Sequence, residues 1–311
     1  MPTSIELPAE KASAIDLTQM CNNLTKEMQN IDNTRTTFAL EQVNQNLKIC
    51  LPLTDFNQQV KWIALSSKMY DNFLKVNRTS EQQQYFDLHA LDMAQYPTIQ
   101  QNHFSKFSIR DQYLLKHKGQ AYVELHDTGN GTFIYRRSPQ YLARIFAPYL
   151  PQAEKIFIEN LAEQNTMNLF NNHKLALEPN QISNRALFWE NYVHKYPKSL
   201  YIKDAIYLRD VYNYLLFIGA PLSPVSTAYE NTISDSHLNE IEHLATLNDS
   251  ELSRKSKKFM DFVHSQERIQ NQNDYSDLQE IKIKHQLINA LQLPHLKFNK
   301  LRNCFSDAIC H

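Results

Sequence analysis

The sequence predicts a mostly α-helical protein, a compact array of about ten to twelve helices with one β-hairpin near the middle of the chain. Three observations favour this class. Apolar residues recur at spacings of three and four along most of the chain, which is the period of an amphipathic helix. Capping residues and prolines stand at the ends of these segments. The region at about 121–137 instead alternates as strands do.

The first five predicted helices precede the hairpin. The first two form an antiparallel pair, because a short polar break separates two segments of matching length. A residue that caps helix N-termini precedes the third helix (Thr54 or Asp55) and the fourth (Thr79 or Ser80), and the fourth stops before Pro97. The predicted ranges are 17–28, 39–50, 55–73, 80–96 and 108–116.

The predicted hairpin joins two β-rich segments, Ala121–His126 and Thr132–Arg137. The five residues between them, Asp127–Gly131, include Asn and Gly residues that tolerate positive φ, as a hairpin turn requires. Because a two-stranded hairpin is marginally stable in water, it must pack on the helices or on a third strand.

Seven further helices are predicted after the hairpin. The densest apolar segment among them lies at 200–218 and has apolar residues on every side, so burying it requires neighbouring helices around it. Gly219 ends this segment, and Pro294 ends the last helix. The predicted ranges are 139–146, 151–161, 179–194, 200–218, 235–247, 251–266 and 275–292.

These elements are predicted to form a single compact domain over residues 1–311. The alternative is a division near residue 138, because the hairpin separates the N-terminal helices from the later ones. The parts would then be an N-terminal helical group with the hairpin (12–138), a repeat-like helical half (139–293) and a C-terminal tail (294–311).

Composition excludes several functional classes. The formal net charge of −1 provides no excess of Lys and Arg to neutralise phosphates, so we expect no nucleic-acid binding. The 4 Gly residues are too few for glycine-rich phosphate loops, dinucleotide turns or a G-x-S-x-G nucleophile elbow. The longest uncharged run, 211–229, is interrupted by Gly219, Pro221 and Pro224, so no membrane span is predicted.

The four cysteines lie as two pairs near the ends of the chain. The simplest pairing is Cys21–Cys50 and Cys304–Cys310, in which each disulfide closes a local loop. The alternative is four free thiols in a cytoplasmic protein. A zinc site is disfavoured because the chain has no C-x-x-C spacing, and we predict neither a metal nor another cofactor.

The cysteines bear on the compartment of the protein. Disulfides persist in oxidising compartments, and the opening MPTSIELPAEKASAIDL resembles the start of a mature exported protein, without a signal peptide of its own. We therefore predict a periplasmic or secreted protein whose leader is absent from this sequence, with a cytoplasmic protein as the alternative.

One stretch resembles a known family. Residues 187–205, LFWENYVHKYPKSLYIKDA, resemble a phrase common in tetratricopeptide-type repeats of bacterial envelope proteins. Pro197 ends one helix, Ser199 can cap the next, and Ala205 is small enough for a close helix crossing. The resemblance covers one repeat length, 187–219, without a second copy in register. It implies helix-pair packing in an exported bacterial protein.

The same stretch contains the candidate binding groove. Tyrosine combines an apolar ring with a hydrogen-bonding tip, so aromatic residues here could hold a peptide or a glycan. Charged residues within the apolar segment are the best candidates for acid-base chemistry. The alternatives are that the aromatic residues form helix-pair core and that the charges lie on an ion-paired stripe. The candidates are Trp189, Glu190, Tyr192, Tyr201, Asp204, Tyr207, Arg209 and Tyr212.

Two other groups of side chains have the chemistry of a binding site. Arg136 and Arg137 end the hairpin, and with Arg144 they form a candidate contact for an anion, since guanidinium groups bind carboxylates through paired hydrogen bonds. The alternative is a solvated strand end. His237 and His243 lie about 120° apart around a predicted helix, so they do not readily share one metal ion.

The function predicted from the sequence is that of a non-enzymatic binding or scaffolding protein of the bacterial envelope, which holds a protein or peptide through helix-pair surfaces. The first alternative is a hydrolase of cell-wall or other glycans, with carboxylates on separate helices. The second is a translocated toxin or immunity protein.

Overall fold

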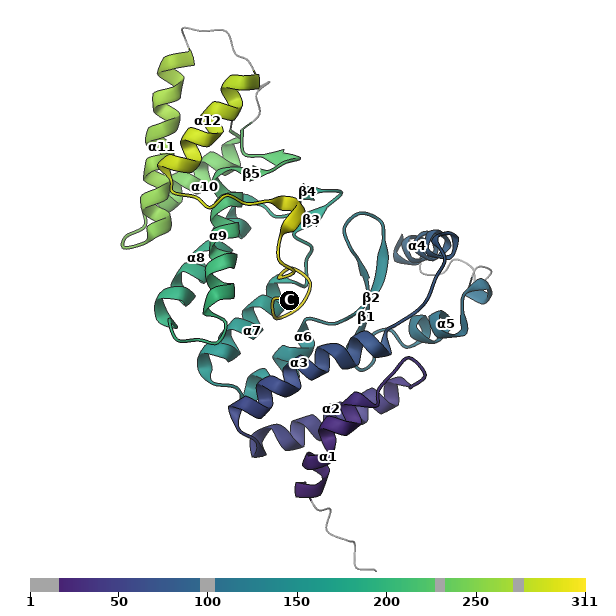
Figure 1. The fold of residues 1–311 in the computed structure, drawn as a ribbon. Coiled ribbons are helices and arrows are strands. Elements are labelled where there is room, and N and C mark those ends of the chain that lie inside the picture. The colour runs from purple at the N-terminus through teal and green to yellow at the C-terminus, as the bar shows by residue number, and fades with distance from the viewer. Residues whose placement is uncertain (1–16, 96–103, 227–232, 271–276) are drawn as a thin grey trace, which may run out of the picture. The chain divides into compact units, whose positions relative to one another are not determined.

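The computed structural model describes residues 17–95, 104–226, 233–270 and 277–311 (Figure 1). Contacts within the chain divide it into two compact units, an N-terminal unit (Met1–Val76) and a C-terminal unit (Asn77–His311). The described residues form twelve α-helices and a few short antiparallel strand pairs, which confirms the mostly α class. In this part of the chain, no helix combines the length and the apolar character needed to cross a membrane.

The described part of the N-terminal unit, from residue 17 on, contains three α-helices. Each begins where an apolar stripe begins, and Asp55 caps the third helix by accepting a hydrogen bond from the Gln58 backbone N–H at 2.8 Å. The predicted disulfide Cys21–Cys50 joins the first helix to the end of the second, with 5.5 Å between the two Cα atoms. The helices are α1 (Leu17–Gln29), α2 (Thr37–Cys50) and α3 (Phe56–Phe73).

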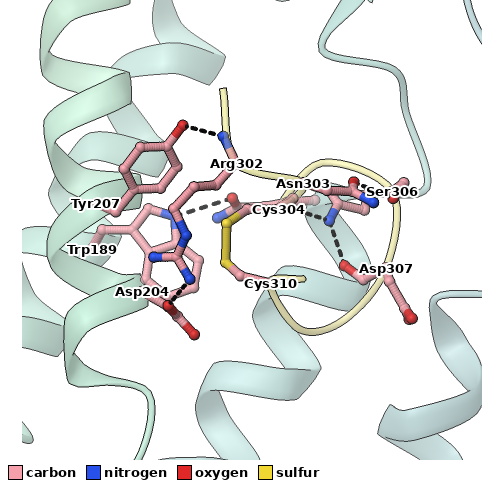
Figure 2. Close-up of a disulfide and its surroundings, with 11 residues drawn as sticks. Trp189, Asp204, Tyr207, Arg302, Asn303, Cys304, Ser306, Asp307 and Cys310 are labelled. Atoms are coloured by element: carbon pink, nitrogen blue, oxygen red, sulfur yellow. Dashed lines mark hydrogen bonds and ion pairs between the residues drawn. A yellow bond between two sulfur atoms is a disulfide. The ribbon is translucent and has the colours of Figure 1, made fainter. Parts of the chain in front are cut away.

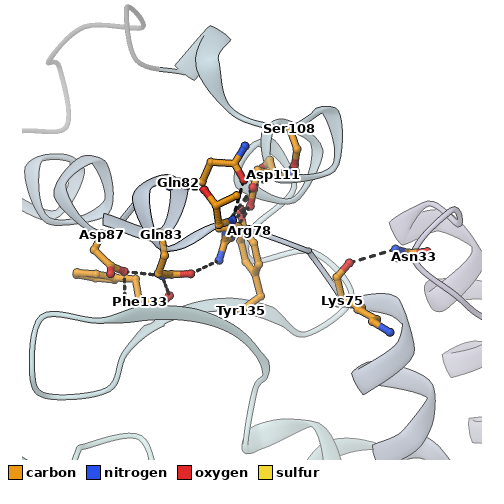
Figure 3. Close-up of polar contacts among 11 residues, drawn as sticks. Asn33, Lys75, Arg78, Gln82, Gln83, Asp87, Ser108, Asp111, Phe133 and Tyr135 are labelled. Carbon is orange, nitrogen blue, oxygen red and sulfur yellow. Dashed lines mark hydrogen bonds and ion pairs between the residues drawn. The ribbon is translucent and has the colours of Figure 1, made fainter. Parts of the chain in front are cut away.

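The core of the N-terminal unit is built from all three helices. Leu24 of α1 and Leu47 of α2 are fully buried, and Trp62 of α3 is buried as well. The Trp62 indole N–H donates to Thr25 Oγ1 at 3.0 Å, so the polar end of this large side chain is satisfied. At the end of the unit, the Lys75 carbonyl oxygen accepts a hydrogen bond from the Asn33 side-chain amide at 3.3 Å (Figure 3).

The C-terminal unit contains the other nine described helices. The densest apolar segment forms α9, whose C-terminal half is buried on every side, as its pattern predicts. It pairs with α8, so the predicted helix pair within 187–219 is present. The helices are α4 (Ser80–Gln95), α5 (Ile109–Lys116), α6 (Gln140–Ile145), α7 (Gln152–Gln164), α8 (Pro179–Lys195), α9 (Ile202–Phe217), α10 (Asp235–Ala245), α11 (Glu251–Gln270) and α12 (Asp277–Ala290).

The predicted hairpin consists of β1 (Val123–Asp127) and β2 (Phe133–Arg137), paired antiparallel with Val123 opposite Arg137. Its first strand starts two residues later than predicted. Ala121 and Tyr122 have φ values of 46° and 62°, which an extended strand cannot accommodate.

Alternation gives the hairpin two different faces. On one face, Leu125, Phe133 and Tyr135 pack around the fully buried Phe86 of α4. The other face presents the polar residues Glu124 and Arg136. The hairpin therefore packs on α4 through its apolar face, whereas its other face is partly exposed, with Ile134 at 42 %.

Two short strand pairs were not predicted. They are β3 (Phe170–Asn171) with β4 (Lys174–Leu175), and β5 (Gly219–Ala220) with β6 (Ser223–Pro224). Strands of two residues leave no periodicity in the sequence. Gly129 of the hairpin turn makes room for the first pair: its φ is +89°, and a Cβ atom there would collide with the Phe170 carbonyl oxygen.

Contacts within the chain place the division after Val76, so the residues on both sides of residue 138 lie in the C-terminal unit. The reason is the packing of the hairpin. One face contacts α4 and the other contacts the C-terminal end of the chain, through Arg136 and the Ser306 carbonyl oxygen. The hairpin thus joins the segments that it was expected to separate.

An ion pair anchors the first residues of the C-terminal unit to α5 (Figure 3). The Arg78 guanidinium binds the Asp111 carboxylate through Nε, at 3.1 Å from both oxygens, and through Nη2. It also lies 3.6 Å from the ring centroid of Phe86. The Tyr135 hydroxyl donates to the Asp111 carbonyl oxygen at 3.1 Å. Burial and the Asp111 charge raise the pKa of Tyr135 far above its usual value.

Candidate functional site

The candidate site surrounds the C-terminal segment, which we define as Arg302–His311. The second predicted disulfide, Cys304–Cys310, closes this segment into a loop, with 4.1 Å between the Cα atoms. Both predicted pairings are thereby confirmed, and no cysteine of the chain is free. After α12 the chain, yellow in Figure 1, returns to α7 and α9. The buried Cys304, Ala308 and Ile309 fix the loop to the unit.

Helix α9 binds the start of the C-terminal segment (Figure 2). The Tyr207 hydroxyl accepts a hydrogen bond from the Arg302 backbone N–H at 3.0 Å. The Arg302 guanidinium donates to the Asp204 carboxylate at 2.6 Å and lies 5.4 Å from the Tyr207 ring centroid. One turn of α9 thus binds both the main chain and the side chain of Arg302.

The end of α7 binds the middle of the segment. The Asn165 side-chain amide donates to the Cys304 carbonyl oxygen at 2.8 Å and to the Asp307 carbonyl oxygen at 2.5 Å. Asn165 is 2 % exposed, so its amide binds the loop away from water. Arg136 of the hairpin adds a hydrogen bond to the Ser306 carbonyl oxygen at 3.3 Å. These three contacts recognise the main chain of a closed loop.

Arg137 binds the one acidic side chain of the segment, Asp307. Its guanidinium lies 2.5 Å from the Asp307 carboxylate, and the two side chains are 4 % and 14 % exposed. Burial by itself raises the pKa of Asp307, but Arg137 and hydrogen bonds from His311 and the Ala308 N–H outweigh it, so the pKa falls below its usual value. Asp307 therefore stays ionised at neutral pH.

The predicted anion contacts have partners within the chain. Arg137 binds Asp307, and Arg136 binds Glu124 at 3.1 Å. Arg144 is exposed on α6 and is not part of this group. The arginine pair was thus recognised as an anion contact from the sequence, whereas the carboxylates that it binds were not.

Four residues of the predicted groove lie in the core, so they do not line a groove. Trp189, Tyr192, Tyr201 and Tyr212 are all buried. The Trp189 indole N–H donates to Gln164 Oε1 at 3.1 Å, and Phe157 of α7 stacks on Tyr201 with 4.5 Å between ring centroids. Helix α7 covers Trp189, Tyr192 and Tyr201. The Tyr212 ring instead contacts Phe305 of the C-terminal segment, with 6.4 Å between ring centroids. All four are core residues, as the alternative interpretation has it. Burial raises the pKa of Tyr192 to about 12.

The other four predicted groove residues lie nearer the surface. Asp204 and Tyr207 contact the C-terminal segment as described. The Glu190 carboxylate accepts hydrogen bonds from the backbone N–H groups of Glu251 and Leu252, both at 2.8 Å, and so caps the N-terminus of α11. Arg209 pairs with the adjacent Asp210 at 2.7 Å. The predicted groove and the predicted arginine group therefore meet at the C-terminal segment. Asp204 and Tyr207 of the groove contact it, and so do Arg136 and Arg137 of the arginine group.

The hairpin face beside the segment carries a histidine. His126 Nε2 lies 3.4 Å from Arg136 Nη1. Burial, and after it the Arg136 charge, lower the pKa of His126 to about 4, because Glu124 and Asp127 act in the opposite direction without compensating. At neutral pH this imidazole is uncharged and accepts a hydrogen bond from the guanidinium.

This pKa predicts an acid-sensitive stability. An unfolded histidine takes up a proton near pH 6.5, whereas folded His126 does so near pH 4. Its contribution to the free energy of unfolding is therefore complete above pH 6.5 and is lost as the pH falls toward 4. We expect the His126→Gln variant to lose less stability between pH 7 and pH 5 than the wild type, measured by urea unfolding. The same substitution at the exposed His264 should leave the loss of unfolding free energy between pH 7 and pH 5 as large as in the wild type. Equal losses in all three proteins would contradict the role of His126.

His237 and Glu240 have structural partners on neighbouring helices. The His237 ring bonds to the Leu216 carbonyl oxygen at the end of α9, and Glu240 accepts a hydrogen bond from the Ser183 hydroxyl of α8. In the described ranges, no three His, Cys, Asp or Glu side chains gather closely enough to hold a metal ion together.

Comparisons of this chain with protein-family models, with curated proteins and with solved structures find no match. The resemblance of residues 187–219 to a tetratricopeptide-type repeat stays a prediction.

Proposed function

We propose that the protein is a non-enzymatic binding or scaffolding protein of the bacterial envelope, which holds a peptide segment of a partner on the surface formed by α7, α9 and the hairpin. One observation carries this proposal. The surface already holds a disulfide-closed peptide, the chain's own C-terminal segment, and most of its contacts are made to the main chain of that peptide.

Main-chain contacts suit a surface that binds peptides. Tyr207 accepts one backbone N–H of the segment, Asn165 donates to two carbonyl oxygens, and Arg136 donates to one. Because every peptide carries these groups, the contacts select a looped backbone more than a particular sequence. The ion pairs Asp204–Arg302 and Arg137–Asp307 add a preference for a basic residue before the loop and an acidic residue within it.

The disulfides support the compartment in this proposal. Two bridges within one chain favour an oxidising compartment, since thiols are kept reduced in the cytoplasm. In the periplasm or outside the cell, disulfide-closed loops are also available as ligands. The compartment and the chemistry of the held peptide therefore agree.

The proposal predicts that the C-terminal segment binds as a separate peptide. A protease site inserted between His295 and Leu296, which lie before the segment, allows the full chain to fold and then to be cut. We expect the cleaved peptide to stay bound during gel filtration and to exchange with a fluorescent, disulfide-closed synthetic peptide of residues 296–311. A linear version with both cysteines changed to Ser should bind about tenfold more weakly or worse, because ordering the open chain costs entropy.

Variants of the surface provide the control. Asn165→Ala and Tyr207→Phe remove contacts to the main chain of the segment and should each weaken binding of the labelled peptide. Lys203→Ala, on an exposed position of α9, should leave it unchanged. If the cut peptide dissociates and the labelled peptide does not bind while the protein stays folded by circular dichroism, the proposed function is wrong.

A further inference from the structure

Helix α4 is apolar on two opposite faces. One face holds Phe86 and Ala90, which are 0 % and 2 % exposed and pack on the hairpin. The other face holds Tyr85, Leu88 and Leu91, which are 49 %, 60 % and 40 % exposed. A helix at the edge of a unit normally places polar residues on its outer face.

The three exposed residues form one continuous stripe. Their spacing of three residues brings each side chain next to the following one along the helix. Single exposed leucines are common in soluble proteins and need no explanation, but a contiguous apolar stripe is typical of an interaction surface. The stripe is separate from the C-terminal segment and its surface, so it does not depend on the proposed function.

The charged side chains of helix α4 itself are all acidic. Helix α4 contains Glu81, Asp87 and Asp92, and it contains no Lys or Arg. Asp87 is engaged with the hairpin, where it accepts the Phe133 backbone N–H at 2.7 Å. Glu81 and Asp92 are exposed, and their positions on the helical wheel put them on the same face as the stripe, one at each end. The stripe is thus bracketed by two exposed carboxylates.

A small hollow adjoins the first residue of the stripe. Tyr85 forms part of its wall, together with Ser108 and with Asp111, the ion-pair partner of Arg78. It provides a place for one side chain of a partner beside the stripe. The lining residues are Gln82, Tyr85, Lys106, Phe107, Ser108 and Asp111.

We infer that the outer face of α4 binds an amphipathic helix of a partner protein that carries apolar residues along one side and basic residues at its ends. The apolar side covers Tyr85, Leu88 and Leu91. The basic ends pair with Glu81 and Asp92. An anionic membrane surface fits less well because it would repel both carboxylates. A second copy of α4 also fits less well, since antiparallel pairing places Glu81 of one copy near Asp92 of the other.

A designed peptide tests this inference. The probe is a fluorescent helical peptide of about four turns, with Leu along one side and Lys at both ends, and its partner probe has Glu in place of Lys. We expect the basic peptide to bind the full chain with saturation in fluorescence anisotropy, and the acidic peptide to bind about tenfold more weakly or worse.

The matched variants place binding on α4. Leu88→Glu should weaken binding of the basic peptide about tenfold or more, because it puts a charge in the middle of the stripe. Leu222→Glu changes an equally exposed leucine, 58 % against 60 %, and should have no effect. Double substitution of Glu81 and Asp92 by Gln should reduce the preference for the basic peptide over the acidic one.

Several outcomes would overturn the inference. Equal weakening by Leu88→Glu and Leu222→Glu would mean that the peptide binds by general attraction to the protein. If the protein forms concentration-dependent dimers that Leu88→Glu abolishes, the stripe binds a second copy of the chain. If the protein binds phosphatidylglycerol vesicles and Leu88→Glu abolishes this binding, the stripe binds a membrane. Peptide exchange at the C-terminal segment serves as a separate readout, because Leu88→Glu should leave it intact.

Discussion

Replacing Arg78 by Met is expected to lower the free energy of unfolding of the C-terminal unit by about 3–5 kcal/mol, the range typical of a buried ion pair that loses one partner. The Arg78 and Asp111 side chains are 10 % and 3 % exposed. Without the guanidinium, the Asp111 carboxylate is left as an uncompensated charge away from water. The substitution also removes the contact with the Phe86 ring and the hydrogen bond to Gln83.

The two tryptophans of the chain make this loss measurable for each unit by itself. Trp62 lies in the N-terminal unit and Trp189 in the C-terminal unit, and the chain has 2 Trp in all. Protein labelled with 5-fluorotryptophan therefore gives two ¹⁹F signals in a urea titration. Arg78→Met should shift the unfolding midpoint at Trp189 strongly, whereas the midpoint at Trp62 should stay in place.

A double substitution separates the charge from the packing. In Arg78→Met with Asp111→Asn the buried charge is gone as well, so part of the lost stability should return. Arg254→Met, at an exposed position of α11, is the matched control and should cost less than about 0.5 kcal/mol. If the double variant is less stable than Arg78→Met alone, the carboxylate charge is not the cause of the loss.

The helices and the hairpin could be predicted because their signals are local. Apolar spacing of three and four is set by the helix itself, and alternation is set by the strand, so α3, α8 and the hairpin follow from residues that are close in sequence. The disulfide pairing was also local, since Cys304 and Cys310 are 6 residues apart and Cys21 and Cys50 are 29 apart.

The site could be predicted only in part, because its partners are distant in sequence. Asn165 is 139 residues from Cys304, and Arg137 is 170 residues from Asp307. No periodicity connects such positions. Tyr207 and Arg137 were singled out as side chains suited to binding, but what they bind is decided by the return of the chain after α12. The closed loop of Cys304–Cys310 was the one local signal that marked this segment.

The aromatic residues of α8 and α9 show a second limit of the sequence. Trp189 and Tyr207 have the same chemical suitability for a groove, and a helical pattern assigns both to faces without saying which neighbour covers each face. Helix α7 covers Trp189, and the C-terminal segment contacts Tyr207. Core and surface are thus separated by tertiary packing that a single sequence does not contain.

The two disulfides should differ in how much they stabilise the protein. In the chain-entropy account a bridge stabilises by restricting the unfolded state, and the effect increases with the length of the closed loop. Replacing Cys21 and Cys50 by Ala opens a separation of 29 residues and is expected to lower the free energy of unfolding of the N-terminal unit by about 3–4 kcal/mol. The same change at Cys304 and Cys310 opens a separation of 6 residues and should cost about 2 kcal/mol.

The ¹⁹F signal of Trp62 measures the larger of these effects. In the Cys304→Ala, Cys310→Ala variant the single remaining bridge is Cys21–Cys50, so adding a reductant should move the Trp62 midpoint far down while the Trp189 midpoint stays in place. The four-alanine variant is the control, because reductant should change neither of its signals. If reduction shifts both midpoints together, the two units unfold as one. If it shifts neither, the bridge does not restrict the unfolded chain, and residual structure near Cys21 and Cys50 must hold the loop closed without it.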